Sequence, residues 1–205
     1  MIEVKELIKN FYNDDVEQKV LKSIDLTIND GEFISIIGPS GSGKSTFLYQ
    51  LSLLDHPTSG EILLNGVDFE SLSSYERTLY RLNNFGFVFQ DYAVMPELDA
   101  IENVALPILM QGLGREKSYK KAKEVLETVG LGDRFNHLPG QLSGGEKQRV
   151  AIARSIGCNP KILFADEPTA NLDSVNSREI VNIFKELHKN GQNIVMVTHE
   201  EEYAY

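Results

Sequence analysis

The residues best suited to chemistry begin in a glycine-rich stretch at residues 38–46, which reads GPSGSGKST and is called the phosphate loop below. It fits the pattern G-x-x-x-x-G-K-[ST], in which glycines leave backbone N–H groups free to converge on phosphate oxygens. A helix that begins directly after the loop adds its free N–H groups and the positive end of its dipole. Lys44 is expected to reach the β- and γ-phosphates, and the Ser45 hydroxyl to be a hard oxygen ligand for Mg²⁺. The predicted phosphate-binding residues are Gly38, Pro39, Ser40, Gly41, Ser42, Gly43, Lys44, Ser45 and Thr46.

An accidental glycine-rich turn is the alternative interpretation, and the flanking sequence argues against it. Residues 33–37 (FISII) are typical of a buried strand, and Phe47, Leu48, Leu51 and Leu54 recur at helical spacing after the loop. A strand, a glycine-rich loop and a helix in this order are the context in which the pattern binds phosphate. We therefore predict that the loop holds a nucleoside triphosphate.

Two adjacent acids, Asp166 and Glu167, follow the apolar run ILFA at residues 162–165. Ligands of open α/β sheets bind at the carboxyl ends of the strands, so both acids are expected near the phosphate loop. Burying an unpartnered carboxylate is costly, which favours a nearby cation over a merely structural pair. Asp166 suits the shell of Mg²⁺, directly or through water, and Glu167 can polarise an attacking water as a general base.

Gln90 and His199 also follow apolar runs, at residues 85–89 and 194–197. Read alone, a glutamine after a strand is usually a surface amide, and a lone histidine is usually just hydrogen-bonded. Strand ends beside the phosphate loop make both residues candidates for the site. Since phosphoryl transfer requires mainly positioning and charge neutralisation, the whole set predicts a hydrolytic site.

The elements that must position these residues change in type along the chain. Apolar and polar residues alternate at 2–4 and 24–28, which predicts antiparallel strands near the N-terminus, and the apolar runs named above predict buried strands. Between residues 91 and 158 the pattern becomes helical, and Ser143 and Glu146 have capping-box spacing at the start of one helix. A further helix is predicted at about 174–189.

Composition limits the class of protein. With 41% hydrophobic and 24% charged residues, the 205-residue chain is typical of a globular protein with one large domain. A formal net charge of −10 predicts no nucleic-acid partner. The apolar stretches are shorter than the ~20 residues that span a bilayer and the start lacks a secretory signal layout, so we expect a cytoplasmic protein unless a partner holds it elsewhere. One cysteine, Cys158, excludes an internal disulfide.

With these motifs in this order, the chain resembles the nucleotide-binding subunits of ABC transporters. The resemblance rests on GPSGSGKST, FVFQ ending at Gln90, LSGGEKQRVAIAR from Leu142, ILFADEP from Ile162, NLD at 171–173 and VTHE around His199. It covers nearly the whole chain, and LSGGE together with a phosphate loop is highly specific. The stretches DEPTANLDS, and FGFVFQ followed by ENVALP, look most like the branch containing lipoprotein-releasing, macrolide-exporting and cell-division ATPases.

The resemblance implies an α/β fold, with a P-loop NTPase (RecA-like) core, an N-terminal antiparallel β subdomain and an inserted α-helical subdomain. It implies a single ABC ATPase domain over residues 1–205, with its core at about 1–90 and 159–205 and the helical subdomain at about 91–158. Two copies are expected to sandwich two ATP molecules head to tail with Mg²⁺, and to power substrate movement through separate integral membrane permease subunits. Export or lipid and lipoprotein extraction is the expected process, and the expected location is cytoplasmic, peripheral on the inner face of the cell membrane.

The resemblance also assigns roles to residues. Ser143, Gly144, Gly145 and Glu146, called the signature segment below, would bind the ATP held by the second copy, and Asp173 would bridge the two copies. Phe11 would stack on adenine, with Tyr12 as the alternative, and residues 92–98 would dock on the permease. The expected catalytic residues are Lys44, Gln90, Glu167 and His199, and the expected metal ligands are Ser45, Gln90 and Asp166.

Some features depart from the family pattern, and other functions compete. Ala170 stands where this branch often has glycine, Glu200 stands where aspartate is common, and the C-terminus is expected to be truncated relative to the family. A regulatory ATPase of the cell-division type, which signals through a membrane partner without transport, is the main alternative. A soluble ABC ATPase of DNA repair or translation is a third, although such proteins usually carry long insertions or two cassettes. The substrate, the direction of transport and the permease are not encoded in this subunit.

Overall fold

The structure is a computed structural model, and it describes residues 1–13 and 16–200. An antiparallel sheet near the N-terminus has the order β2-β1-β4-β5, with β1 (Ile2–Asn13), β2 (Val16–Ile28), β4 (Ser59–Leu64) and β5 (Val67–Asp68). Ile2 pairs with Ile28 and Val4 with Leu26, so the alternating pattern buries one face, as predicted.

A second, parallel sheet has the order β3-β8-β7-β6, with β3 (Phe33–Ile37), β8 (Asn193–Thr198), β7 (Ile162–Asp166) and β6 (Phe85–Val88). The register aligns Ile37 with Thr198, Val197 with Asp166, and Ala165 with Val88. All four strands therefore end at the same edge of the sheet, which brings the segments that follow them together.

Eight helical elements connect the strands within the described residues. The α-helices are α1 (Lys44–Leu51), α2 (Ser74–Asn84), α3 (Ala100–Met110), α4 (Arg115–Thr128), α5 (Gly144–Ile156) and α6 (Ser174–Lys189), and two short 3₁₀ turns are η1 (Phe69–Ser71) and η2 (Pro139–Gln141). None of the helices in this part of the chain is both long and apolar enough to cross a membrane.

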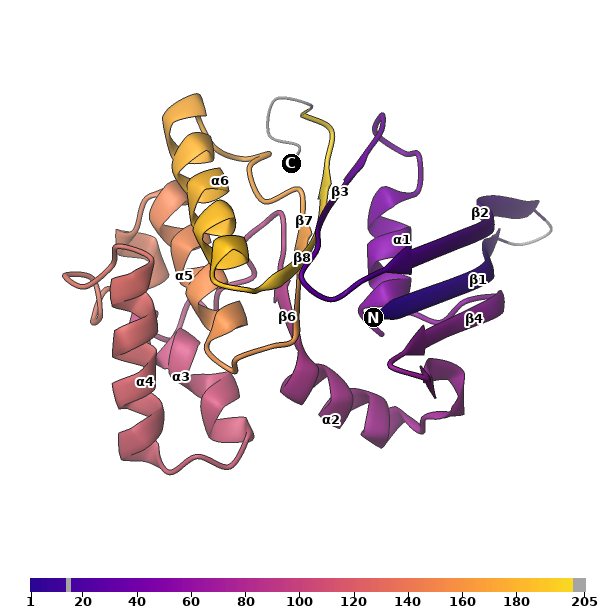
Figure 1. The fold of residues 1–205 in the computed structure, drawn as a ribbon. Coiled ribbons are helices and arrows are strands. Elements are labelled where there is room, and N and C mark those ends of the chain that lie inside the picture. The colour runs from indigo at the N-terminus through magenta and orange to yellow at the C-terminus, as the bar shows by residue number, and fades with distance from the viewer. Residues whose placement is uncertain (14–15, 201–205) are drawn as a thin grey trace.

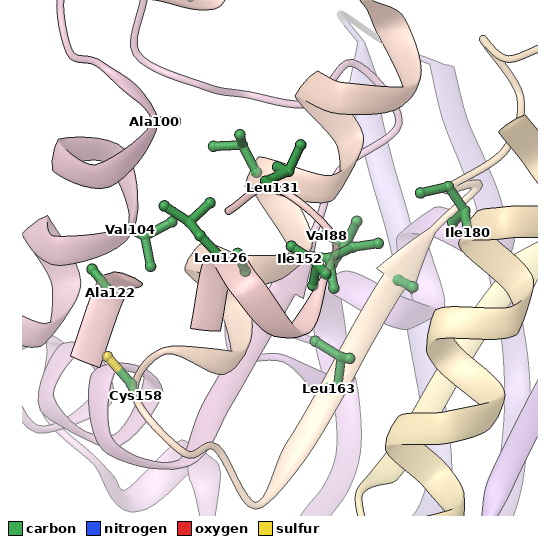
Figure 2. Packing of buried hydrophobic residues seen from close by; sticks show 14 of the residues in the cluster. Val88, Ala100, Val104, Ala122, Leu126, Leu131, Ile152, Cys158, Leu163 and Ile180 are labelled. Carbon is green, nitrogen blue, oxygen red and sulfur yellow. The ribbon is translucent and has the colours of Figure 1, made fainter. Parts of the chain in front are cut away.

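The parallel sheet separates two hydrophobic cores. Figure 1 shows α3, α4, α5 and α6 on one side of it, and α1 with the antiparallel sheet on the other. In Figure 2, Val104, Leu126 and Ile152 come from α3, α4 and α5 and gather near Val88 and Leu163 of the sheet. Apolar residues of α1 and of the antiparallel sheet form the second core. The α/β fold with an antiparallel β subdomain is confirmed.

Three local expectations were wrong or incomplete. Strand 33–37 is only partly buried because β3 lies at the edge of the described sheet, with β8 as its neighbour. Helix α1 ends at Leu51, so Leu54 is 44% exposed while Leu53, which no pattern indicated, is buried. Helix α2 lies where no helix was expected.

Candidate functional site

The common edge of the parallel strands carries the predicted site. The phosphate loop follows β3, Gln90 follows β6, Glu167 follows β7 and His199 follows β8. Crossover connections bring these segments together from widely separated parts of the sequence. The phosphate loop, Gln90, Asp166, Glu167 and His199 are together called the phosphate-loop site below.

The phosphate loop has the backbone freedom that its glycines predict. Gly41 and Gly43 have φ angles of 78° and 93°, in the left-handed region that favours glycine. A Cβ atom at Gly43, the residue before α1, would lie 2.9 Å from a Val20 methyl carbon. Lys44 is 7% exposed, and its Nζ atom donates to the carbonyls of Gly38 at 2.9 Å and Pro39 at 3.0 Å.

Ser45 and Asp166, the two oxygen ligands that the sequence predicts, are in direct contact. The Ser45 hydroxyl donates to Asp166 Oδ1 at 2.8 Å, and Asp166 is 5% exposed. Burial raises the pKa of Asp166, and the hydrogen bonds from Ser45 and Tyr49 partly oppose that shift. Tyr49 is affected in turn, since its own burial and the charge of Asp166 raise its pKa to about 12.

Glu167 lies between Lys44 and His199, two of the other predicted catalytic residues. Its Oε1 atom is 3.7 Å from Lys44 Nζ, and its Oε2 atom is 3.0 Å from His199 Nδ1. The backbone of Glu167 has a φ angle of 43°, which is strained for a residue with a side chain, and its N–H donates to Val197 O at 2.9 Å. This anchor to β8 holds the carboxylate at the phosphate loop.

Two neighbouring cavities open at this edge. One, of about 440 Å³, is lined by Phe11, Gln18, Val20, residues of the phosphate loop, Gln90 and Glu167. The other, of about 590 Å³, is lined by residues 37–40, Glu167 and His199, and shares Ser40 and Glu167 with the first. A cavity of about 530 Å³ around Lys161 and Asn193 lies at the opposite end of the strands and is lined by none of the predicted site residues.

The two candidates for contact with adenine differ in position. Phe11 is 43% exposed and lines the cavity at the phosphate loop, with Lys9 Nζ 5.0 Å from its ring centroid. Tyr12 is 68% exposed, does not line that cavity, and donates its hydroxyl to Glu17 at 3.2 Å.

The signature segment is built separately, at the N-terminus of α5. The Ser143 N–H donates to Glu146 Oε2 at 2.8 Å, and the Glu146 N–H donates to Ser143 Oγ at 3.2 Å, so the predicted capping box is present. A Cβ atom at Gly145 would lie 2.1 Å from the Asn176 side chain, so glycine permits the close approach of α6. None of the four signature residues lines either cavity at the phosphate loop.

Asp173 is the N-cap of α6. Its carboxylate accepts from the N–H groups of Val175 at 3.0 Å and Asn176 at 2.9 Å, and from the Asn176 amide at 2.7 Å. These hydrogen bonds, above all that from the Asn176 backbone, lower the pKa of Asp173. The side chain is thus held in place and remains exposed for other contacts.

Comparison with known proteins identifies the family. The sequence profile described as ABC transporter matches residues 21–170. The chain belongs to the ABC transporter family. An uncharacterized ABC transporter ATP-binding protein of Methanocaldococcus jannaschii is 50% identical over 98% of this chain and 90% of its own length. The lipoprotein-releasing system ATP-binding protein LolD of Aquifex aeolicus is 46% identical, over 98% of this chain and 87% of its own.

Two further relatives extend the comparison. The macrolide export ATP-binding/permease protein MacB of Bdellovibrio bacteriovorus is 46% identical over 98% of this chain, which corresponds to 31% of its own length. The dimeric post-hydrolysis structure of the ATP-binding cassette MJ0796 with ADP and Pi has a TM-score of 0.92 and 42% identity, and covers 100% of this chain and 90% of its own. This ABC chain is accordingly an ATP-binding and ATP-hydrolysing transporter subunit, as predicted.

Sequence reasoning missed several residues that support the site of this ABC subunit. The Asn171 side chain donates to Gln90 O at 3.0 Å, and Arg154 of α5 donates to the carbonyls of Tyr92 and Ala93. Tyr49 approaches Asp166 from α1. Asn171 and Arg154 both lie in stretches that carried the family resemblance, but no periodicity or spacing indicates which backbone carbonyl a side chain will reach.

Proposed function

We propose that two copies of this chain close over two ATP molecules, each copy supplying the phosphate-loop site for one ATP and the signature segment for the other. The proposal is supported by the dimeric structure of the 42% identical cassette. It is also supported by the separate positions of the phosphate-loop site and the signature segment in this chain. The signature segment has the free N–H groups of a helix N-terminus but lines neither cavity at the phosphate loop.

Glu167 carries the hydrolytic part of the proposal. It faces the cavity at the phosphate loop, between Lys44 and His199. When ATP binds, Lys44 exchanges its contacts with the loop carbonyls for the phosphates, and Glu167 becomes free to orient the attacking water. His199, at 3.0 Å from the same carboxylate, holds the water and the γ-phosphate in line.

The donor set at Ser45 and Asp166 fits Mg²⁺. A hydroxyl and a buried carboxylate 2.8 Å apart are hard oxygen ligands, and the raised pKa of Asp166 reflects a carboxylate that lacks full compensation by its neighbours. Gln90 lines the same cavity and is the proposed third protein ligand. Mg²⁺ held by these residues would supply neutralisation of phosphate charge. Phe11, which also lines this cavity, is proposed to stack on adenine.

A permease is proposed to dock on the groove beside the segment after Gln90. The groove has a volume of about 330 Å³, and its lining includes Phe87, Met95, Pro107, Met110 and Arg154. It lies between the end of β6 and helix α3, where the proposed helical subdomain at about 91–158 meets the core. An apolar groove with one cationic side chain suits a short amphipathic helix of a membrane subunit.

Transport is proposed to be export, or extraction of a lipid or lipoprotein, by analogy with the lipoprotein-releasing protein LolD and the macrolide export protein MacB. The subunit would then be peripheral on the inner face of the membrane, held by its permease. Co-purification with an ABC permease that stimulates hydrolysis supports this process. Co-purification with a membrane regulator of a cell-wall hydrolase, without any transported substrate, contradicts it.

A mixing experiment tests the shared site. Lys44→Ala removes the proposed contact of the phosphate loop with the ATP phosphates, and Ser143→Arg blocks the signature segment. Each variant alone is expected to hydrolyse little ATP. In a mixed dimer one site receives both changes and the other receives neither, so hydrolysis should reappear on mixing. If each chain used its own signature segment, every copy would carry one lesion and mixing would restore nothing.

A further inference from the structure

The signature segment poses an electrostatic problem. Glu146 lies in the first turn of α5, where its carboxylate interacts favourably with the helix dipole and with the Ser143 N–H. The same helix end is proposed to receive a triphosphate from the second copy. A carboxylate at that place repels the incoming phosphates unless its charge is compensated.

Arg134 supplies the compensation, and its Nη1 atom also donates to the carboxylate of the exposed Asp133 at 2.5 Å, where solvent screens the charge. Arg134 lies between α4 and η2, and its Nε atom donates to Glu146 Oε1 at 2.9 Å, while Glu146 Oε2 remains on the Ser143 N–H. The ion pair is short although both side chains keep some exposure, 35% for Arg134 and 18% for Glu146. Hydrogen bonds from Ser143 and from Arg134 lower the pKa of Glu146, so the carboxylate stays ionised and in place.

The loop that carries Arg134 is itself anchored. The first two N–H groups of α3, those of Ala100 and Ile101, donate to His137 O and Phe135 O, each at 3.0 Å. The His137 N–H donates to Arg134 O at 3.0 Å. Arg134 therefore projects from a fixed backbone, and the geometry of its contact with Glu146 follows from the packing of α3.

We propose that Arg134 is a positioning residue of the signature segment: it neutralises Glu146 and fixes it against Ser143, so that the helix end can accept the triphosphate of a second copy. The Ser143 oxygen already accepts from the Glu146 N–H at 3.2 Å, which leaves its hydroxyl hydrogen free to donate to phosphate. This inference rests on the proposed function. A purely structural role is weak by comparison, because partly exposed ion pairs add little to stability.

The test measures ATP-dependent dimerisation by sedimentation velocity in a Glu167→Gln parent, in which bound ATP is hydrolysed slowly. Arg134→Ala should weaken dimerisation about tenfold, because it leaves the Glu146 charge uncompensated, at a partly exposed site, where the triphosphate of the second copy arrives. ATP affinity of the monomer and the Tm should stay at the parental values. Arg134→Gln, which keeps most of the side-chain packing, is the second variant and should act in the same direction.

Arg149→Ala is the matched control, because it breaks the 2.6 Å ion pair between Arg149 of α5 and Glu179 of α6, away from the N-terminus of α5. It should leave dimerisation unchanged. In a background carrying Glu146→Gln, where no charge needs compensation, the effect of Arg134→Ala should shrink to about twofold or less.

The outcomes separate this inference from the function on which it rests. If the Glu167→Gln parent does not dimerise with ATP, the shared site itself is wrong, and the inference is wrong with it. If the parent dimerises and the Arg134 variants dimerise equally well, only the role of Arg134 is overturned. If Arg134→Ala weakens dimerisation as strongly in the Glu146→Gln background, the claim that Arg134 acts by compensating the charge of Glu146 is overturned.

Discussion

The phosphate-loop site and the signature segment both offer backbone N–H groups to anions, but they differ in how far apart in sequence their contacting residues lie. The phosphate-loop site gathers its side chains from the ends of four strands, and its contacts join residues far apart in sequence, such as Ser45 with Asp166. The signature segment is completed by a capping box within four residues and by Arg134 nearby. The first depends on the whole fold, whereas the second is a local structure that can be presented to another molecule.

The largest expected effect comes from removing the proposed general base of the phosphate-loop site, Glu167. Glu167→Gln should lower hydrolysis by about 10²–10⁴-fold, the usual contribution of a general base, while ATP still binds. Phosphate release and nucleotide titration measure the two quantities. Glu179→Gln, at an exposed acid on α6, should leave both unchanged. Unchanged hydrolysis in Glu167→Gln would show that another group activates water.

Nucleotide binding by a single copy should depend on the phosphate-loop site alone. Lys44→Ala should weaken ATP binding to the monomer about ten- to hundredfold, because a charge-assisted hydrogen bond to phosphate is lost. Titration with a fluorescent ATP analogue at a protein concentration below that of dimerisation measures it. An equal loss in Ser143→Ala would contradict the separation of the two parts.

Ser143→Ala tests the signature segment without changing the phosphate-loop site. Loss of the N-cap should cost about 1 kcal/mol, which corresponds to a fall in Tm of roughly 2–4 °C for a chain of this size. Monomer affinity for ATP should stay as in the parent, and steady-state hydrolysis should fall. Calorimetry and nucleotide titration check the first two expectations. Ser143→Asp, which keeps a capping oxygen but adds negative charge, should keep the Tm and still lose hydrolysis.

The smallest expected effect concerns Asp166 and pH. Burial raises its pKa above the ordinary value of 3.8, so the folded protein holds this proton more tightly than the unfolded chain. Stability from this group is therefore present at low pH and is lost as pH rises through the raised pKa. Without nucleotide or metal, Asp166→Asn should raise the Tm at neutral pH, and the gain should vanish near pH 4 and below. A gain in Tm that persists unchanged at low pH would exclude ionisation as its cause.

Much of the phosphate-loop site was predictable because its residues follow strands. Apolar runs located the ends of β6, β7 and β8, and the rule that ligands bind at carboxyl ends of strands then placed Gln90, Glu167 and His199 together. The capping box of Ser143 and Glu146 was predictable from spacing alone. Helix α2 was missed although Ser73 and Glu76 have the same spacing and form a capping box, because its apolar residues are few.

Other features depend on tertiary packing and have no local signal. The left-handed backbone of Glu167 is fixed by its bond to β8, and nothing in the sequence around it indicates that strain. The exposure of Leu54 and the burial of Leu53 follow from the end of α1 one turn earlier than apolar spacing indicated. The contact of Arg134 with Glu146 spans a turn and η2, where no periodic pattern applies.

The two hydrophobic cores on opposite faces of the parallel sheet have a consequence for how such chains diversify. Side chains of α3 and α4 pack in one core, while α1 and the antiparallel sheet, which frame the nucleotide cavity, pack in the other. Both cores pack on the same parallel strands, since Val88 and Leu163 belong to the first core and Phe164 and Val197 to the second. Substitutions on the outer surface of α3 and α4 do not touch the residues that line the nucleotide cavity, so the helical surface can vary while the cavity keeps its lining.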